Sequence, residues 1–310
     1  MTTTPIELIP GAALSRPDWL KVRLPASDGN YTELKNIMRG LSLHTVCEEA
    51  RCPNIGECWG HRTATFMILG DVCTRACRYC AVTSGKPHQL DLAEPRHVAE
   101  AVRKMSLKHA VVTSVDRDDL PDFGAGHFAI TIRVIRELNP GCAVEVLTPD
   151  FQGDETALAT VMAARPDIFN HNIETVERVF RRVRPGRSAY RTSLRVLARA
   201  KQLDPSCLTK SGLMVGLGET ADEVHETMRD LRTQNVDILT IGQYLRPTAK
   251  HVEIHRYVHP SEFAQFKEYG LSIGFAHVES GPLVRSSYHA HEQSELLGSR
   301  SSTGRGSAEE

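Results

Sequence analysis

Short apolar runs rich in β-branched residues recur along most of the chain, and polar segments of helical period separate them. The runs do not alternate between apolar and polar positions as a half-exposed strand does, so several of them predict strands buried on both faces. These predicted strands occupy residues 64–69, 110–115, 143–147, 168–173, 211–217, 238–244 and 274–278.

The segments between the runs carry the period of amphipathic helices. Val224, Met228 and Leu231 form one apolar face in the last of them. Thr220 and Glu223 form a capping box ahead of that face, which predicts where the helix begins. Helices are predicted at residues 95–105, 127–138, 155–164, 176–183, 190–203 and 221–232.

The order of these elements predicts the fold class. Strands that alternate with helices form a parallel sheet, and six or seven such units are enough for the sheet to curl. We therefore expect an α/β protein, a partial (β/α)6-type TIM barrel with N-terminal and C-terminal extensions. Cys142 and Cys207 fall at the starts of predicted strands, at the end of the barrel opposite a site, where a cysteine packs as a small apolar residue.

Six further cysteines form two groups of three in one short window. The first triplet is Cys47, Cys52 and Cys58, and the second is Cys73, Cys77 and Cys80. Closed zinc and iron–sulfur sites take four protein ligands, so a triplet either takes a fourth ligand from elsewhere or leaves one metal position open for chemistry. A zinc site completed by His61 or His88 is the alternative for one triplet, but two triplets in tandem favour iron–sulfur clusters.

The spacing and neighbours of both triplets carry a family resemblance. The second reads Cys73-Thr-Arg-Ala-Cys77-Arg-Tyr-Cys80 and resembles the motif of radical S-adenosylmethionine (SAM) enzymes. The first has four and then five residues between its cysteines and resembles the lipoyl synthase family. The resemblance covers residues 15–290 and continues in residues 31–35, 64–66, 117–121, 149–151, 171–174, 216–219, 243–247 and 281–288.

The resemblance implies two [4Fe–4S] clusters and SAM as cofactors. In such enzymes the second triplet holds the cluster that binds SAM, which makes Cys73, Cys77 and Cys80 catalytic residues. The first triplet would hold an auxiliary cluster, with Ser287 of the Arg-Ser-Ser-Tyr motif as its fourth ligand and a further catalytic residue. Alternatively, Ser286 and Ser287 only form a turn, as paired serines commonly do.

Polar residues follow the predicted strands at the end where α/β barrels place their sites. Loops that lead from strand to helix are polar in most proteins, so the assignment of these residues to SAM or substrate rests on their location alone. The candidates for SAM contacts are Ser114, Asn172, Glu174, Gly216, Gly218 and Glu219, and Asp116, His171, Gln243 and Arg246 lie among them.

The resemblance also implies the reaction. A 5′-deoxyadenosyl radical would abstract hydrogen from unactivated carbons of an octanoyl chain, which no general base can deprotonate. Sulfur from the auxiliary cluster would then enter at C6 and C8 to give a lipoyl group. Two alternatives stay open: a radical SAM enzyme with another sulfur-inserting or methylthio-transferring reaction, and a non-catalytic iron–sulfur or zinc protein.

The implied partners are proteins. They are octanoylated lipoyl carrier domains, namely the H protein of glycine cleavage and the E2 subunits of 2-oxoacid dehydrogenases, and an electron donor such as ferredoxin or flavodoxin. The 37 basic and 38 acidic residues leave the chain close to neutral, and no block of like charges predicts a nucleic acid partner.

Three parts of the chain are expected to differ in role. Residues 1–60 would be an extension that carries the first triplet, residues 61–280 the barrel, and residues 281–310 a C-terminal extension with the serine motif and a disordered tail rich in serine and glycine. No apolar run approaches the length of a membrane span, and residues 1–5 lack the features of a signal peptide. We therefore expect a cytoplasmic protein with no membrane partner, in which eight cysteines serve as thiols and metal ligands.

Overall fold

The computed structural model describes residues 15–21, 29–41, 43–49, 52, 54–60 and 65–287. Its main sheet has eight strands in the order β1-β2-β5-β6-β7-β8-β9-β10. β1 is antiparallel to β2, and every other neighbouring pair is parallel. The strands are β1 (His44–Thr45), β2 (Thr65–Ile68), β5 (His109–Ser114), β6 (Ala143–Leu147), β7 (Ile168–Asn170), β8 (Leu208–Val215), β9 (Ile238–Gln243) and β10 (His277–Gly281). A second, small sheet pairs β3 (Val72–Cys73) with β4 (Thr83–Ser84).

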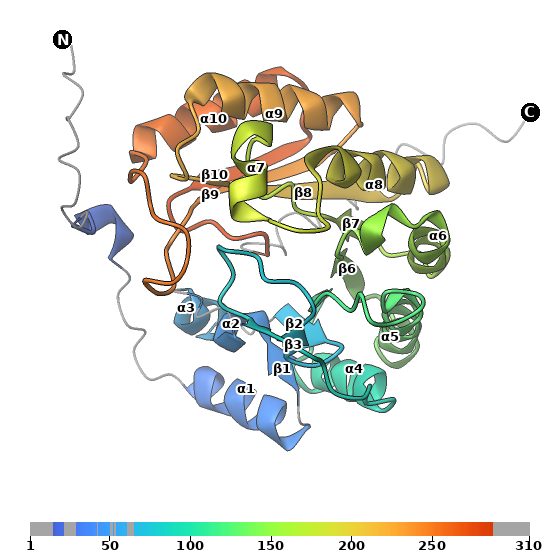
Figure 1. Cartoon of the computed structure of the whole chain (residues 1–310). Coiled ribbons are helices and arrows are strands. Elements are labelled where there is room, and N and C mark those ends of the chain that lie inside the picture. Colours follow the sequence, from blue (N-terminus) through green and yellow to red (C-terminus); the bar gives the residue numbers. More distant parts are fainter. Residues whose placement is uncertain are drawn as a thin grey trace, which may run out of the picture.

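Helices connect the parallel strands and lie on the outside of the curved sheet (Figure 1). The apolar core fills the space between the two layers, with Phe66, Phe128 and Phe169 among its fully buried side chains. The helices are α1 (Gly29–Gly40), α2 (Val46–Glu49), α3 (Ile55–Gly60), α4 (Glu94–Lys104), α5 (Ala125–Leu138), α6 (Glu155–Ala163), α7 (Glu177–Val183), α8 (Tyr190–Leu203), α9 (Ala221–Thr233) and α10 (Pro260–Ser272), with short 3₁₀ helices η1 (Asp18–Leu20) and η2 (Phe151–Gly153).

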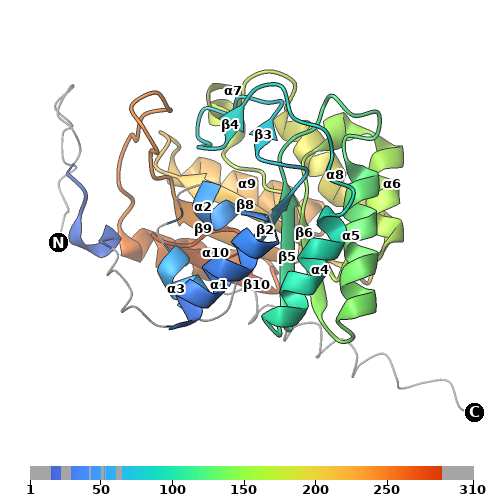
Figure 2. The same cartoon turned by 90° about the horizontal axis from the view of Figure 1, so that it is seen from below.

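The sheet curls without closing. Among the described strands, β1 and β10 stand at its two edges and do not pair with each other. Six strand–helix units run from β2 to α10, and β10 follows as the last parallel strand. The prediction of a partial (β/α)6-type barrel is therefore confirmed. Figure 2 shows β3 and β4 at one end of this barrel, the end to which β5 leads.

Three predicted strands differ from the structure by two residues or more at a boundary, and one of them is β8, which runs from Leu208 to Val215 and not from residue 211 to residue 217. β7 ends at Asn170 and not at residue 173, and beyond it the chain keeps only separate backbone contacts with β8, from His171 to Lys210 and from Glu174 to Gly212. β10 begins at His277 and not at residue 274, because Gly274, with a φ of 97°, belongs to the turn that follows α10. The boundaries of β6 and α8 and the capping box of α9 agree with the predictions.

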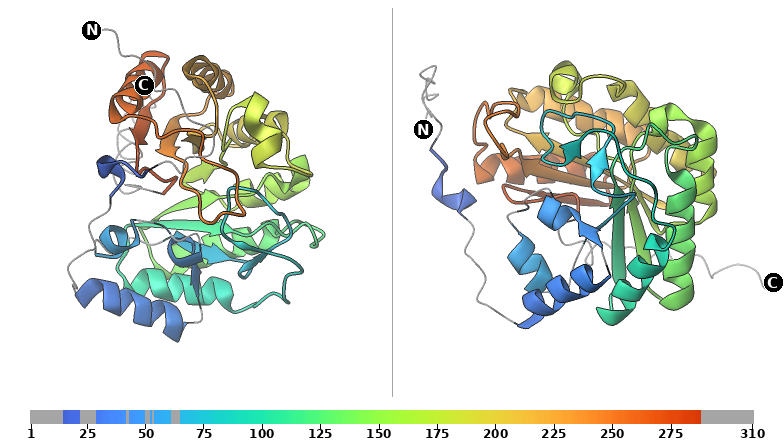
Figure 3. Two further views of the ribbon diagram at one scale, coloured as in Figure 1. Left: turned by 60° about the vertical axis from the view of Figure 1, so that its left-hand side comes forward. Right: turned by 60° about the horizontal axis from the view of Figure 1, so that its bottom comes forward.

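Four of the described α-helices, namely α1, α2, α3 and α10, have no counterpart among the predictions. α10 begins at a capping box formed by His259 and Glu262 and buries Phe263 and Phe266. α1 lies against α3 and α4, so the N-terminal extension covers the barrel from outside. η1 lies beside the start of α10, where the rings of Trp19 and His259 meet edge to face at 5.2 Å (Figure 3). The predicted disordered tail lies outside the described residues.

No helix in the described ranges is long and apolar enough to cross a membrane.

A charged group lies inside the barrel, where sequence periodicity predicts only apolar residues. Nζ of Lys210 on β8 lies 2.9 Å from Oε1 of Glu145 on β6, and both side chains are 0% exposed. Nε2 of His109 lies 3.3 Å from the second carboxylate oxygen. Burial alone would raise the pKa of Glu145, but Lys210 and His109 lower it to about 2. The buried carboxylate of Glu145 therefore depends on the positive charge of Lys210 to remain ionised inside the barrel.

We predict that Lys210→Met lowers the free energy of unfolding by about 3–5 kcal/mol, because it leaves a buried carboxylate without its partner. Glu145→Gln combined with Lys210→Met should recover part of that loss. Urea unfolding followed by circular dichroism under anaerobic conditions measures both. Arg96→Met, which breaks the mostly exposed pair of Arg96 and Glu100 on α4, is the control and should cost about 0.5 kcal/mol or less. A Lys210→Met loss no larger than that of the control would contradict the prediction.

Candidate metal and cofactor site

The second cysteine triplet lies on a loop at the carboxyl end of the parallel strands. Cys73 ends β3, and the loop is closed by backbone hydrogen bonds from Gly85 to Cys73 (2.9 Å) and from Cys80 to Cys77 (3.2 Å). The sulfur of Cys73 accepts the backbone N–H groups of Arg75 (3.4 Å) and Asp116 (3.3 Å). The chain itself therefore orients this thiol, and the loop is attached to the end of β5.

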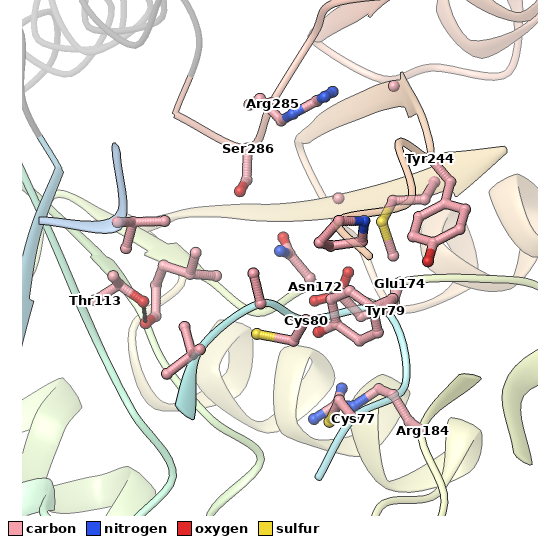
Figure 4. Close-up of a pocket in the computed structure, with 18 of the residues that line it drawn as sticks. Cys77, Tyr79, Cys80, Thr113, Asn172, Glu174, Arg184, Tyr244, Arg285 and Ser286 are labelled. Carbon is pink, nitrogen blue, oxygen red and sulfur yellow. Dashed lines mark hydrogen bonds between the residues drawn. The ribbon is translucent and has the colours of Figure 1, made fainter. Parts of the chain in front are cut away.

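All three cysteines of this triplet line one cavity of about 520 Å³ inside the mouth of the barrel. That size suits a small-molecule ligand. Side chains from the ends of β5 to β9 form its walls, and Figure 4 shows Cys77, Cys80 and Tyr79 on one side of the cavity with Arg285 and Ser286 on another. The apolar part of the wall comprises Val46, Met67, Val82, Val115, Leu147, Leu213, Met214, Leu245 and Val284.

Arg75, between the first two cysteines of the triplet, holds three acidic residues. Its guanidinium makes two 2.8 Å hydrogen bonds to Asp118, lies 2.8 Å from Oδ1 of Asp150 and lies 3.2 Å from Oδ1 of Asp116. Although burial opposes the charge, these carboxylates raise the pKa of Arg75. The cysteine loop is thereby tied to the loops that follow β5 and β6.

A second buried arginine, Arg184, lies among the anionic groups of the cavity (Figure 4). Burial opposes its charge, but Tyr79, Glu174 and Cys77 raise its pKa further than burial lowers it. Its positive charge in turn lowers the pKa of Cys77, which burial raises. Arg184 is therefore the group that compensates negative charge directly beside the triplet.

The thiols of the second triplet are protonated in the metal-free protein at neutral pH. Burial is the largest cause, and it raises the pKa of Cys73 to about 12 and that of Cys80 to about 11. Asp116, next to Cys73, adds to the rise in that thiol. Metal binding by these residues must therefore release protons, as it does wherever thiolates are the ligands.

Three of the candidate SAM residues line the cavity. Ser114 is the last residue of β5, and Asn172 and Glu174 follow β7. Ser114 Oγ, Asn172 Oδ1 and Thr148 Oγ1 are buried there without a hydrogen-bond partner. Buried polar atoms are normally satisfied, so these three fit a ligand that carries polar groups, as SAM does. The contact itself stays a prediction.

The other three candidates, Gly216, Gly218 and Glu219, do not line the cavity. The carboxylate of Glu219 accepts the backbone N–H groups of Gly216 (2.5 Å) and Leu217 (2.8 Å), so it closes its own loop. Gly216 has a φ of 99°, and a Cβ there would come within 2.1 Å of Nε2 of Gln243. These residues shape the loop between β8 and α9.

The first triplet lies at the open side of the barrel. Cys47 is in α2, Cys58 is in α3, and Cys52 between them donates its backbone N–H to the carbonyl of Cys47 (3.0 Å). Burial raises the pKa of Cys47 to about 11, and the neighbouring backbone of Thr65 acts against this rise. Burial also raises the pKa of Cys52, and the nearby charge of Arg285 acts against it.

The C-terminal segment after β10, residues 282–287, crosses to this triplet. Asn54, between Cys52 and Cys58, donates its side-chain N–H to the carbonyl of Leu283 (2.7 Å). Oγ1 of Thr65 donates to Oγ of Ser287 (2.8 Å), whereas Ser286 lines the cavity. The structure therefore brings Ser287 to the neighbourhood of Cys47, and its role as a ligand stays a prediction.

Neither triplet has the geometry of a site for one metal ion. No group of three His, Cys, Asp or Glu side chains within the described ranges is close enough to hold a single ion. His88 is exposed and His61 lies outside the described residues, so nothing supports the zinc alternative. Each cysteine of a four-iron cluster binds a different iron, and its thiolates can stand further apart.

Sequence reasoning missed Arg75, Arg184, Asn54 and Thr65. Arg184 is the last residue of the run Arg181-Arg182-Val183-Arg184, and such a run is typical of a solvated helix end. Only the fold shows that Arg184 is buried. Asn54 and Arg75 lie within the cysteine motifs, so proximity in sequence is the signal that could have identified them.

Known proteins match both parts of this site. Residues 67–231 match the radical SAM superfamily, and residues 5–52 match the N-terminal domain of lipoyl synthase of the radical SAM family. A lipoyl synthase of Rubrobacter xylanophilus is 67% identical over 280 residues, which cover 90% of this chain and 87% of that protein. A lipoyl synthase of Halalkalibacterium halodurans is 62% identical over 279 residues, 90% of this chain and 91% of that protein.

Solved structures show the same fold at low sequence identity. The FeFe-hydrogenase maturase HydG of Carboxydothermus hydrogenoformans aligns with a TM-score of 0.54 at 13% identity, over 76% of this chain and 66% of that one. SuiB of Streptococcus suis bound to S-adenosylmethionine aligns with a TM-score of 0.53 at 9% identity, over 78% of this chain and 57% of that one. With two relatives above 60% identity over nine tenths of its length, the chain belongs to the lipoyl synthase family of the radical SAM superfamily.

Proposed function

We propose that the protein inserts two sulfur atoms, at C6 and C8, into an octanoyl group held in amide linkage on a lysine of a carrier domain. One observation supports this proposal above all. The cavity that contains the second triplet extends to Val46 and Ser286, the chain neighbours of Cys47 and Ser287. An acyl chain in that cavity would lie between the place of hydrogen abstraction and the place of sulfur donation.

SAM and two [4Fe–4S] clusters are the cofactors of this family. Cys73, Cys77 and Cys80 would hold the cluster that, when bound, supplies the electron for cleavage of SAM to the 5′-deoxyadenosyl radical. The first triplet and Ser287 would hold the auxiliary cluster, whose sulfide is the second substrate. Serine oxygen is a harder ligand than thiolate, so an iron held by Ser287 is more easily released once sulfur bonds to carbon.

The cavity wall suits a radical reaction on an aliphatic chain. Val115, Leu147 and Leu213 offer an apolar surface along which an octanoyl chain can bury its methylene groups. The same surface excludes water and positions the carbons, which are the tasks left to a protein when a radical performs the abstraction. Ser114 and Asn172 would then orient SAM through their unpartnered oxygens.

The partners follow from the proposed substrate. The carrier would be the H protein of glycine cleavage or an E2 subunit of a 2-oxoacid dehydrogenase, and ferredoxin or flavodoxin would supply electrons. All eight cysteines are free thiols, which suits the reducing cytoplasm that we propose as the location.

We predict that octanoyl-carrier reacts at least about 100-fold faster than free octanoate. A free carboxylate that is buried against the apolar part of the wall loses its water, whereas the amide of a carrier-bound chain stays neutral. Anaerobic incubation with SAM, a reductant and either substrate, read by mass spectrometry, measures the ratio. Comparable turnover of the two substrates would refute the proposed substrate form.

Replacement of Cys73, Cys77 and Cys80 together by Ala should abolish SAM cleavage and leave one cluster bound. The two triplets lie on separate segments, so loss of one set of ligands need not disturb the other. Iron and sulfide analysis with an assay for 5′-deoxyadenosine checks both statements. The prediction would be contradicted if the variant lost all its iron or still made 5′-deoxyadenosine. Either result would mean that the second triplet does not hold a separate cluster that cleaves SAM.

Ser287→Ala should retain SAM cleavage but lose the second sulfur insertion or both, because the auxiliary cluster would lack its oxygen ligand. Mass spectrometry of the carrier distinguishes octanoyl, monothiolated and dithiolated products. Ser286→Ala is the comparison and should have the smaller effect, since Ser286 faces the cavity and not Thr65. Equal product yields from Ser287→Ala and the unaltered protein would exclude Ser287 as the fourth ligand.

A further inference from the structure

Thr65 touches both ends of the auxiliary ligand set. It is the first residue of β2, in register with Val111 of β5, and it is 4% exposed. Its backbone lies beside the thiol of Cys47 and acts to lower the pKa of that thiol. Its hydroxyl donates to Oγ of Ser287 at 2.8 Å, across 222 positions of sequence. One residue of the barrel thus contacts a cysteine from the N-terminal part and the serine from the C-terminal part.

Among the described residues, the other contacts that hold the C-terminal segment end at Arg285. Asn54 holds the carbonyl of Leu283, and the carbonyl of Val284 lies so close to Gly242 of β9 that a Cβ there would come within 2.1 Å of it. Arg285 donates to the carbonyl of Val284 (2.7 Å). Beyond these contacts, the hydrogen bond from Thr65 is what the structure offers to fix the direction of the Ser287 side chain.

The chemistry of threonine suits this task. A serine hydroxyl can occupy three staggered positions, and only some of them would direct its oxygen to a metal. Threonine is branched at Cβ and its χ1 is restricted, so its hydroxyl is a well-oriented donor. A donor directed at a serine oxygen also stabilises the negative charge that the oxygen carries when it binds a metal. Partners outside the ligand shell that orient metal ligands act in this way.

We propose that Thr65 is a positioning residue for the sulfur-donating site: its hydroxyl holds the Ser287 oxygen toward the cluster held by Cys47, Cys52 and Cys58. This inference rests on the proposed function, because it requires Ser287 to be a ligand. Thr65 neither binds iron nor touches the acyl chain. It acts through Ser287, and its loss should reproduce the loss of that serine.

The test uses three substitutions at or near the contact. Thr65→Val keeps the shape and the backbone N–H but removes the hydroxyl, and Thr65→Ser restores the hydroxyl. Thr131→Val is the matched control, because Thr131 on α5 is also buried and its hydroxyl makes a single 2.8 Å bond, to the carbonyl of His127. If the loss of any buried hydroxyl were enough to cause the effect, Thr131→Val would show it as strongly as Thr65→Val.

Two readouts separate positioning from a merely structural role. In the full chain loaded with both clusters, Thr65→Val should cleave SAM at the normal rate but form dithiolated carrier about 10-fold more slowly. With ⁵⁷Fe in the Cys73/Cys77/Cys80→Ala background, Mössbauer spectra should show that Thr65→Val loses the distinct oxygen-bound iron, as Ser287→Ala does. Thr65→Ser and Thr131→Val should keep it.

The outcomes distinguish this inference from the proposed function. If Ser287→Ala alters the spectrum and Thr65→Val does not, the serine is a ligand but the role given to Thr65 is wrong. If neither alters it, the serine ligand of the proposed function fails and the inference fails with it. If Thr131→Val alters the spectrum as much as Thr65→Val, the effect is one of general stability and the inference is also overturned.

Discussion

Two buried arginines hold the anionic end of this barrel together. The cavity mouth gathers cysteine thiols, Asp116 and Glu174 in a space from which water is largely removed, and negative charges cannot accumulate there without compensation. Arg75 supplies it from within the cysteine loop, and Arg184 supplies it from the C-terminal end of α7. Removal of either arginine would leave buried carboxylates unpaired. The resulting loss in the free energy of unfolding is far larger than the net stabilisation that the ion pair itself contributes. The cysteine loop and the loops that follow β5 and β6 are held together by this compensation.

Arg75 also determines the shape of the cysteine loop, because it is part of that loop. Its bonds to Asp118 and Asp150 join the loop to the ends of two different strands, and the backbone N–H of Thr74 donates to the carbonyl of Asp116 (3.0 Å). The second triplet is therefore arranged by protein contacts that do not involve metal. Preorganisation of this kind is what a site needs if its ligands must be in place when the metal arrives.

The fold and the ligands were predictable from the sequence to different degrees, for physical reasons. Strand and helix positions follow from local periodicity, which is why β6 and α8 agree at both ends. The cysteine groups follow from spacing. Contacts between distant segments leave no local pattern: Lys210 and Glu145 meet only because β8 and β6 face the same interior, and Arg184 looks like a surface residue in its own helix end. Glu219 stands in a motif that suggests a ligand contact, yet its carboxylate serves its own loop.

The two triplets are supported in different ways, and the difference matches the tasks proposed for them. The second triplet lies on a loop that buried ion pairs hold to the ends of the strands. This rigid support suits the proposed SAM-binding cluster, because that cluster must stay intact through every turnover. The first lies in short helices outside the barrel, near the gap between the edge strands β10 and β1, and meets the C-terminal segment through single hydrogen bonds from Asn54 and Thr65. Bonds of that kind contribute about 1 kcal/mol each and can open without unfolding the barrel. The ligand set proposed above, built from both ends of the chain and joined to the barrel edge by a few such bonds, could therefore release an iron while the cavity beside it keeps its shape.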